Sequence, residues 1–90
     1  MRPAKIPTPA APTVLSDDGS GEHQYAIIAV GVQGYRTVAS SVTKARGRAR
    51  LRWDRVNGAD AYIVVRDGSE IAGPLRIEGS QKEWTDKGGR

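Results

Sequence analysis

The chain of 90 residues contains no cysteine and no phenylalanine, and it has one histidine and one methionine. Without cysteine it can form no disulfide, no cysteine-ligated zinc site and no catalytic thiolate. Long apolar runs are also missing. The longest, residues 25–32, is far shorter than the roughly 20 residues of a membrane-spanning helix, so we expect no membrane insertion. The length fits one domain, since domains start near ~50 residues, and that domain must be held together by packing.

Proline is concentrated at the start of the chain, where residues 1–12 hold four of the five prolines. This stretch has no apolar run, so we expect neither a signal-peptide core nor a membrane anchor in it. Prolines donate no ladder hydrogen bonds, and little apolar surface is available to anchor the segment. We therefore divide the chain into a flexible proline-rich leader, residues 1–11, and a single module, residues 12–90.

In the first half of the module, apolar residues recur at every second position between turn-forming residues. After a short strand at residues 13–15, a long strand is expected over residues 23–32, with Tyr25, Ile27 and Ala29 on one face. Both faces of this strand are largely apolar, which predicts a central place in its sheet. We expect residues 35–43 to form the return strand and residues 44–48 to be a basic link.

The second half of the chain shows a sharper alternation. Leu51 and Trp53 alternate with arginines, as in a half-buried strand. The next strand, residues 61–66, is followed by Asp67-Gly68, which is typical of a two-residue hairpin. Weaker strands are expected around residues 74–78 and 83–85. The total of about seven strands predicts an all-β sandwich.

Residues 51–68, LRWDRVNGADAYIVVRDG, resemble the second and third strands of bacterial fibronectin type III domains. In that family the aromatic residues at the positions of Trp53 and Tyr62 lie in the core, and we expect both on paired strands. The stretch WTDKG, residues 84–88, is similar to the one that usually follows. Residues 25–30, then Gly34, and then residues 39–42 resemble the last two strands of the family. The resemblance implies a fibronectin type III-like, immunoglobulin-like β-sandwich.

The strand order differs from that of an ordinary member of this family, because the segment that resembles the final hairpin comes before the segment that resembles the second strand. Two explanations remain open. The chain either contains halves of two neighbouring domains, or is one rearranged sandwich with the hairpin moved forward. We favour the second, because each half-domain would leave an apolar sheet face uncovered. The rearranged order is similar to modules of phage tail-fibre and bacterial surface proteins.

Residues for catalysis are few. The single histidine, His23, begins a strand, and no base-and-nucleophile pair is apparent beside it. The carboxylates are scattered through turns, so acid–base catalysis is not expected either. Asp17, Asp18 and Glu22 flank a flexible turn and could offer oxygen atoms to calcium, but their spacing fits no known loop, and we interpret them as a solvated turn. We expect no enzyme, no metal and no cofactor.

Positive charge is the most uneven feature of the sequence. Residues 44–55 hold six of the 14 basic residues and only one of the 10 acidic residues, within a net charge of +4. Arginines at alternate strand positions share a face and could meet phosphates or an acidic glycan. They could equally keep an outer strand solvated and protect it from strand addition. The candidate anion- or partner-binding residues are Lys44, Arg46, Arg48, Arg50 and Arg52.

From these features we expect a non-catalytic structural, adhesive or spacer module of a phage tail or bacterial surface protein. Its partners would be neighbouring protein domains or a cell-surface polymer, and its location the virion or the cell exterior. The alternative is a carbohydrate- or polyanion-binding module that uses the arginine-rich strand. Nucleic acid is not expected as a partner, because the basic pI comes without a recognised binding motif.

Overall fold

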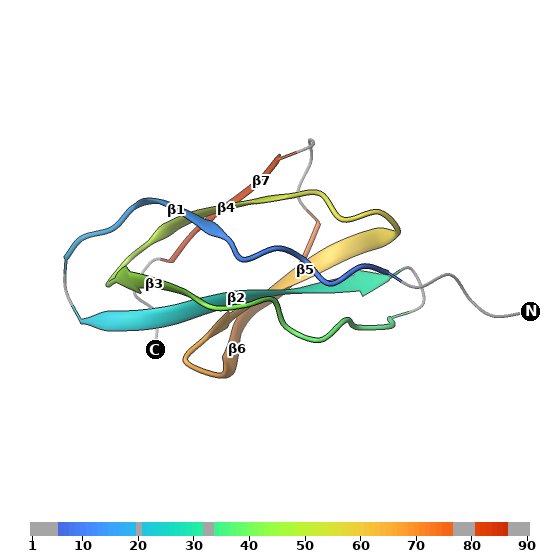
Figure 1. Ribbon diagram of the computed structural model, residues 1–90, viewed down its shortest axis with the longest axis horizontal. Coiled ribbons are helices and arrows are strands. Elements are labelled where there is room, and N and C mark those ends of the chain that lie inside the picture. The colour runs from blue at the N-terminus through green and yellow to red at the C-terminus, as the bar shows by residue number, and fades with distance from the viewer. Residues whose placement is uncertain (1–5, 20, 32–33, 77–80, 87–90) are drawn as a thin grey trace, which may run out of the picture.

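In the computed structural model the chain forms two antiparallel β-sheets packed face to face (Figure 1). The structure describes residues 6–19, 21–31, 34–76 and 81–86. Its strands are β1 (Thr13–Ser16), β2 (Glu22–Gly31), β3 (Thr43–Arg46), β4 (Arg50–Asp54), β5 (Ala59–Arg66), β6 (Ser69–Leu75) and β7 (Gln81–Thr85). One sheet has the order β1-β4-β7 and the other β3-β2-β5-β6. The predicted all-β sandwich of about seven strands is confirmed. A membrane-spanning helix is not found among the residues that the structure describes.

β2 has the central position that its two apolar faces predict. It pairs with β3 along one edge and with β5 along the other, in a register that runs from Tyr25 opposite Arg66 to Val30 opposite Ala61. Tyr25, Ile27 and Ala29 face the interior and are fully buried. The intervening residues of β2 form a second apolar cluster on the other face of the sheet, together with Ala61, Ile63 and Val65 of β5.

The main core draws on both halves of the chain. Ile27 from the first half lies in the same buried cluster as Leu51 and Val64 from the second half. Each sheet covers the apolar face of the other, as a two-layer architecture requires. The early hairpin therefore contributes to the same core as the strands that follow it.

Trp53 and Tyr62 are core residues, but the prediction that their strands pair is wrong. Trp53 lies on β4 of the three-stranded sheet and Tyr62 on β5 of the four-stranded sheet. Their rings meet edge to face across the interior, with centroids 5.8 Å apart. The Tyr62 hydroxyl accepts a hydrogen bond from the backbone amide of Val56, at 2.8 Å. The contact thus joins the two sheets instead of two neighbouring strands.

The return strand begins later than predicted. Residues 35–42 form only an isolated bridge, between Val30 and Arg36, and the strand β3 starts at Thr43. In residues 35–42 side-chain hydroxyls replace ladder bonds: the amide of Ile27 donates to Ser40 Oγ at 3.0 Å, and that of Ala29 to Thr37 Oγ1 at 3.1 Å. Serine and threonine side chains commonly compete with backbone ladders in this way. Of the predicted basic link, residues 44–48, residues 44–46 belong to β3 and only residues 47–48 lie outside it.

The β5–β6 hairpin has a turn at Asp67-Gly68 and a further glycine, Gly73, within β6. Asp67 and Gly68 both have positive φ, 51° and 83°, as a type I′ turn requires, so the predicted hairpin is confirmed. At Gly73, with φ of 120°, an added Cβ would lie 2.6 Å from the carbonyl oxygen of Tyr62. β6 begins directly after the turn, at Ser69, whereas the strand was predicted to begin at residue 74. Residues 77–80, where that prediction ended, lie outside the described residues.

The described part of the leader lies against the sandwich. Pro9 is buried, and directly after the leader the buried Pro12 accepts a hydrogen bond at its carbonyl oxygen from Thr43 Oγ1, at 2.7 Å. A Cβ added at Gly31 would lie 2.5 Å from Cδ1 of Ile6, so Ile6 occupies the space that this glycine leaves. Residues 1–5 lie outside the described residues. The flexibility expected of residues 1–11 stays a prediction.

We expect Trp53→Ala to lower the free energy of unfolding by about 3–5 kcal/mol, because it leaves a cavity between the two sheets. Trp53 is 4% exposed. Urea titration followed by circular dichroism measures the change. Tyr35→Ala is the matched control, because Tyr35 is 63% exposed, and it should change the stability by less than about 0.5 kcal/mol. Equal losses in the two variants would contradict the central place of Trp53.

Candidate functional site

The five basic candidates come from different sheets. Lys44 and Arg46 flank the core residue Ala45 on β3, so they point away from the interior on the four-stranded sheet. Arg50 and Arg52 flank the core residue Leu51 on β4, so they point outward from the three-stranded sheet. Arg48 lies in the short β3–β4 connection. The outer faces of two stacked sheets point in opposite directions, and the structure therefore does not gather these side chains on one surface.

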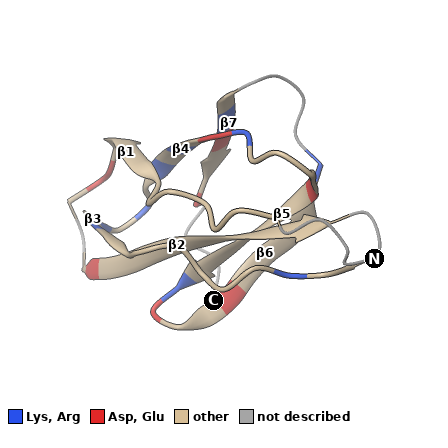
Figure 2. Cartoon of the chain, turned by 45° about the vertical axis from the view of Figure 1, so that its right-hand side comes forward, with Lys and Arg blue, Asp and Glu red and all other residues tan. Residues whose placement is uncertain are grey.

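Two of the five candidates are paired with carboxylates. Arg50 donates to Glu83 Oε1 of β7 through Nε, at 3.1 Å, and Nη2, at 2.5 Å. Arg48 lies 4.0 Å from Asp18. Lys44, Arg46 and Arg52 have no ion pair with another described residue. Figure 2 shows the same mixture across the molecule, with basic and acidic segments interleaved over several strands.

The arginines of β4 do not lie on an outer strand, as the sequence analysis had considered. β4 is the central strand of its sheet, between β1 and β7, so it has no free edge that charge would need to protect. The alternation itself is confirmed, because Ala49, Leu51 and Trp53 are buried. Arg50 and Arg52 thus solvate the outer face of a central strand.

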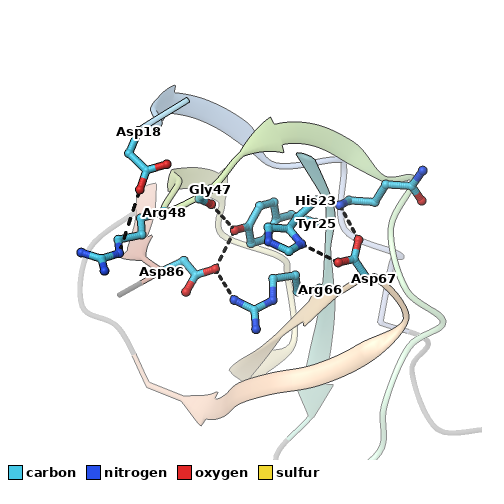
Figure 3. Close-up of polar contacts among 9 residues, drawn as sticks. Asp18, His23, Tyr25, Gly47, Arg48, Arg66, Asp67 and Asp86 are labelled. Carbon is cyan, nitrogen blue, oxygen red and sulfur yellow. Dashed lines mark hydrogen bonds and ion pairs between the residues drawn. The ribbon is translucent and has the colours of Figure 1, made fainter. Parts of the chain in front are cut away.

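Several polar contacts among the described residues meet at one end of the sandwich, where the chain crosses between sheets. The β1–β2 and β3–β4 connections meet there: the amide of Gly47 donates to the carbonyl of Gly21 at 2.8 Å, and that of Asp18 to the carbonyl of Arg46 at 3.2 Å. The chain that leaves β7 joins them, because the amide of Asp86 donates to the carbonyl of Ala49 at 2.9 Å. We call this region, centred on Tyr25, Gly47, Arg66 and Asp86, the closing end (Figure 3).

The Tyr25 hydroxyl is the centre of the closing end. It lies 2.8 Å from the carbonyl oxygen of Gly47 and 2.6 Å from Asp86 Oδ2, and Arg66 Nη1 donates to the same carboxylate oxygen at 2.7 Å (Figure 3). A tyrosine hydroxyl has one hydrogen, which these two acceptors share. Burial, and then the bond to Asp86, raises the pKa of Tyr25 well above its usual value. The bond to Asp86 also raises the pKa of Arg66, so the guanidinium group stays charged.

A second contact fixes the neighbouring hairpin turn. Asp67 accepts a hydrogen bond from the backbone amide of Gln24 at 2.8 Å, and its other oxygen lies 2.5 Å from Nδ1 of His23. The hydrogen bond from the Gln24 amide, followed by the hydrogen bond from His23, lowers the pKa of Asp67 below its usual value. The only histidine is thereby engaged in holding the β5–β6 turn against the start of β2. The His23 ring also meets the Tyr25 ring edge to face, at 6.3 Å.

The carboxylates considered for calcium are directed to other partners. Asp17 accepts a hydrogen bond from the backbone amide of Arg46 at 3.1 Å, and Asp18 faces Arg48. Glu22 lies opposite Arg46 in the β2–β3 ladder. These contacts tie the β1–β2 connection to β3, which explains an acidic turn at this point without a metal ion.

Among the described residues, the most exposed large apolar side chains lie after β2, which the sequence analysis did not predict. Tyr35, Val38 and Val42 are 63%, 73% and 53% exposed. They lie in the segment for which a regular return strand was predicted, and such a strand would have placed some of them inward. The mixture of hydroxyl and apolar residues over residues 37–43 is the one feature of the sequence that indicates an irregular, exposed segment here.

We expect Tyr25→Phe to destabilise the protein by about 1–3 kcal/mol, because it leaves a buried carbonyl and a buried carboxylate without their shared donor. Chemical unfolding monitored by tryptophan fluorescence measures this change. Tyr35→Phe removes the same atom from an exposed ring, so its stability should equal that of the parent. A Tyr25→Phe protein as stable as the parent would show that the closing end does not depend on this hydroxyl.

The lowered pKa of Asp67 predicts a dependence of stability on pH. Its folded-state pKa lies below the unfolded value of about 4, so the stabilisation is complete above that pH and is lost as the pH falls through the folded pKa. Asp67→Asn keeps a residue suited to the turn and removes the charge that faces His23, Arg66 and the Gln24 amide. The Tm difference from the parent should be largest near neutral pH and disappear in acid.

Thermal unfolding at a series of pH values tests this dependence on Asp67. Asp54→Asn is the control, since Asp54 is exposed and forms no ion pair with another described residue. A Tm difference between parent and Asp67→Asn that is constant across the acidic range would contradict a role for the carboxylate charge.

Neither a protein-family model, nor a curated protein, nor a solved structure matches the chain. The roles of the closing end and of the exposed apolar segment therefore follow from their own geometry.

Proposed function

We propose that the chain is a non-catalytic structural module that holds neighbouring protein domains apart and touches partners through its surface. The observation that carries this proposal is the position of the chain at the two ends of the sandwich. Ile6 fills the space beside Gly31 and Gly58, at the end of β2 and in the β4–β5 turn. Asp86 is bound to Tyr25 at the other end of the sandwich, beside the β3–β4 connection.

This arrangement suits a spacer, because a neighbour before Ile6 and a neighbour after Asp86 would be separated by the length of β2. β2 spans ten residues, which corresponds to roughly 30 Å at about 3.3 Å per residue. The core shared by the two sheets makes that distance rigid. A module with both ends on one side would bring its neighbours together instead.

We further propose that the module is fibronectin type III-like with a rearranged strand order. Immunoglobulin-like sandwiches place their first, second and fifth strands in one sheet, and the last two strands beside the third in the other. If β2 and β3 are counted after β7, the sheets β1-β4-β7 and β3-β2-β5-β6 have this arrangement. The sequence resemblance to the family's final hairpin falls on β2 and β3, which supports the same assignment.

A non-catalytic role is supported by where the reactive groups are directed. His23 is bound to Asp67, and the buried Asp86 is bound to Arg66 and Tyr25. Each of these contacts joins strands or connections, and a group that holds the fold in this way is not poised to act on a substrate. The proposed setting remains a phage tail or bacterial surface protein, on the virion or outside the cell, with protein domains or a cell-surface polymer as partners.

No specific observation favours the alternative of a polyanion-binding module. A phosphate or glycan chain is held by cations that converge on one surface. Here Lys44 and Arg46 point outward from one sheet and Arg52 from the other, while Arg50 is held by Glu83. We therefore propose the structural module, and not the polyanion-binding module, as the function of the chain.

The spacer role is tested by fusing one fluorescent protein directly before Ile6 and another directly after Asp86, so that the flexibility predicted for the start of the leader does not broaden the result. Single-molecule energy transfer should give one narrow distance distribution, longer than that of a direct fusion by roughly the 30 Å that β2 spans. A flexible glycine–serine linker of 90 residues is the control and should give a broad distribution. A broad distribution for the module would exclude a spacer. Heparin binding that collapses steeply with salt would favour the polyanion alternative instead.

A further inference from the structure

We propose that residues 36–44, the exposed edge beside β2, bind an extended acidic segment of another protein by strand addition. This inference rests on the proposed function, because a module that acts through protein contacts needs a surface for its partner. The exposed edge comprises the irregular segment after β2 and the first two residues of β3. It combines apolar side chains, free backbone donors and unpaired positive charge.

The backbone of the exposed edge is only half used. The amides of Thr37 and Ser40 turn inward and donate to the carbonyls of Ala29 and Ile27, both at 2.9 Å. Amides that form no hydrogen bond with the described part of the chain lie between and after them; they belong to Val38, Ala39, Ser41 and Val42. Unpaired donors along a sheet edge are the groups to which an added strand binds.

The apolar side chains of the exposed edge point away from β2. Val38 is 73% exposed and Val42 53% exposed, whereas Ser40 between them is 6% exposed and bound to the Ile27 amide. The hydroxyl residues thus attach the segment to the sheet and leave the valines to solvent. An added strand that presents apolar residues at alternate positions could cover both valines.

The other sheet edges are protected against strand addition, which makes this one distinct. The β5–β6 pairing has two register irregularities, and Pro74 in β6 has no amide to donate. β7 carries the inward-pointing Lys82, 6% exposed, with Nζ 5.9 Å from the centre of the Tyr62 ring. β1 is short and irregular in register. Inward charges, irregular registers and prolines are common means of protecting an edge.

Charge indicates the kind of partner. Residues 34–46 contain three basic residues, Arg36, Lys44 and Arg46, and no acidic residue; Arg36 donates to Glu70 Oε2 of β6 at 2.6 Å, which leaves Lys44 and Arg46 for a partner. Lys44 is exposed, has no ion pair with another described residue, and lies opposite the neutral Gln24 in the ladder. A second copy paired edge to edge would bring Lys44 and Arg46 of the two copies together, in a chain whose net charge is already +4. A segment with carboxylates at alternate positions would face them favourably.

The test uses the full-length protein, labelled with ¹⁵N, and an end-blocked ten-residue peptide that alternates valine with glutamate. Amide signals of residues 36–44 should shift on titration, and hydrogen exchange at Val38 and Val42 should slow. A peptide that alternates valine with lysine is the control and should cause no shift. Shifts spread over the whole molecule, or equal shifts with both peptides, would overturn the proposal.

Two pairs of variants locate the site. Val38→Asp combined with Val42→Asp should weaken peptide binding at least about tenfold, since it removes the apolar contacts and adds repulsion. Leu15→Asp alters another exposed apolar residue, on β1, and should bind as the parent does. Lys44→Glu should weaken binding roughly fivefold, whereas Arg55→Glu, the same charge change in the β4–β5 connection, should not. Equal losses from Lys44→Glu and Arg55→Glu would show non-specific attraction and overturn the site.

Sedimentation of the free protein distinguishes a partner from a second copy. A monomer up to millimolar concentration is expected, and a dimer abolished by the valine substitutions would overturn the choice of an acidic segment. The fluorescent fusion with both valines replaced should keep its narrow distance distribution. If peptide binding fails while that distribution stays narrow, only this inference fails. A broad distribution in the parent protein would instead remove the proposed function.

Discussion

The pairing of β2 with β5 is the interaction on which the rest of the structure depends. β2 comes from the first half of the chain and β5 from the second, and their register extends from Tyr25 opposite Arg66 to Gly31 opposite Ala59. This ladder places Ile27 beside Val64 and so positions the first half over the core residues of β4. It also brings the Tyr25 hydroxyl to the same end as Arg66, where Asp86 binds both. Core, closing end and exposed edge all follow from the position of β2.

The two edges of β2 are satisfied by different means, and this difference creates the exposed apolar segment. The edge toward β5 is a regular ladder. On the other edge, four ladder residues of β3 are followed, toward the end of β2, by hydroxyls and single backbone bonds from residues 35–40. Since hydroxyls satisfy the amides of Ile27 and Ala29, no regular strand is needed there, and the valines between them stay exposed. The use of hydroxyls in place of ladder bonds therefore satisfies the amides of β2 but leaves backbone donors and the side chains of Val38 and Val42 exposed.

The alternation of apolar residues was sufficient to predict the strands that fill the core. β2 and β5 were predicted to within about two residues at each end, the alternation of β4 was recognised, and the Asp67-Gly68 turn was identified correctly. Alternation does not reveal which sheet a strand joins, and for this reason Trp53 and Tyr62 were placed on paired strands although they meet across the interior. It also cannot show that Thr37 and Ser40 would bind β2 through their hydroxyls, or that Lys44 and Arg52 would point outward from different sheets. Each of these depends on contacts between residues distant in the sequence.

The closing end explains how a hairpin can occupy an unusual place in the strand order. The chain enters β2 and leaves β3 at adjacent points, because the amide of Gly47 is bound to the carbonyl of Gly21. A hairpin whose ends are adjacent adds no length to the connection in which it stands, so it disturbs neither β1 nor β4. β1 ends and β4 begins at that same end of the sandwich, since Asp18 of the β1–β2 connection is bound to Arg46, four residues before β4 begins. The strands can therefore keep the same positions in the two sheets although they follow one another in a different order along the chain. This order requires additional contacts at the closing end. There Tyr25, Arg66 and Asp86 must hold together three chain segments that are joined by no single turn.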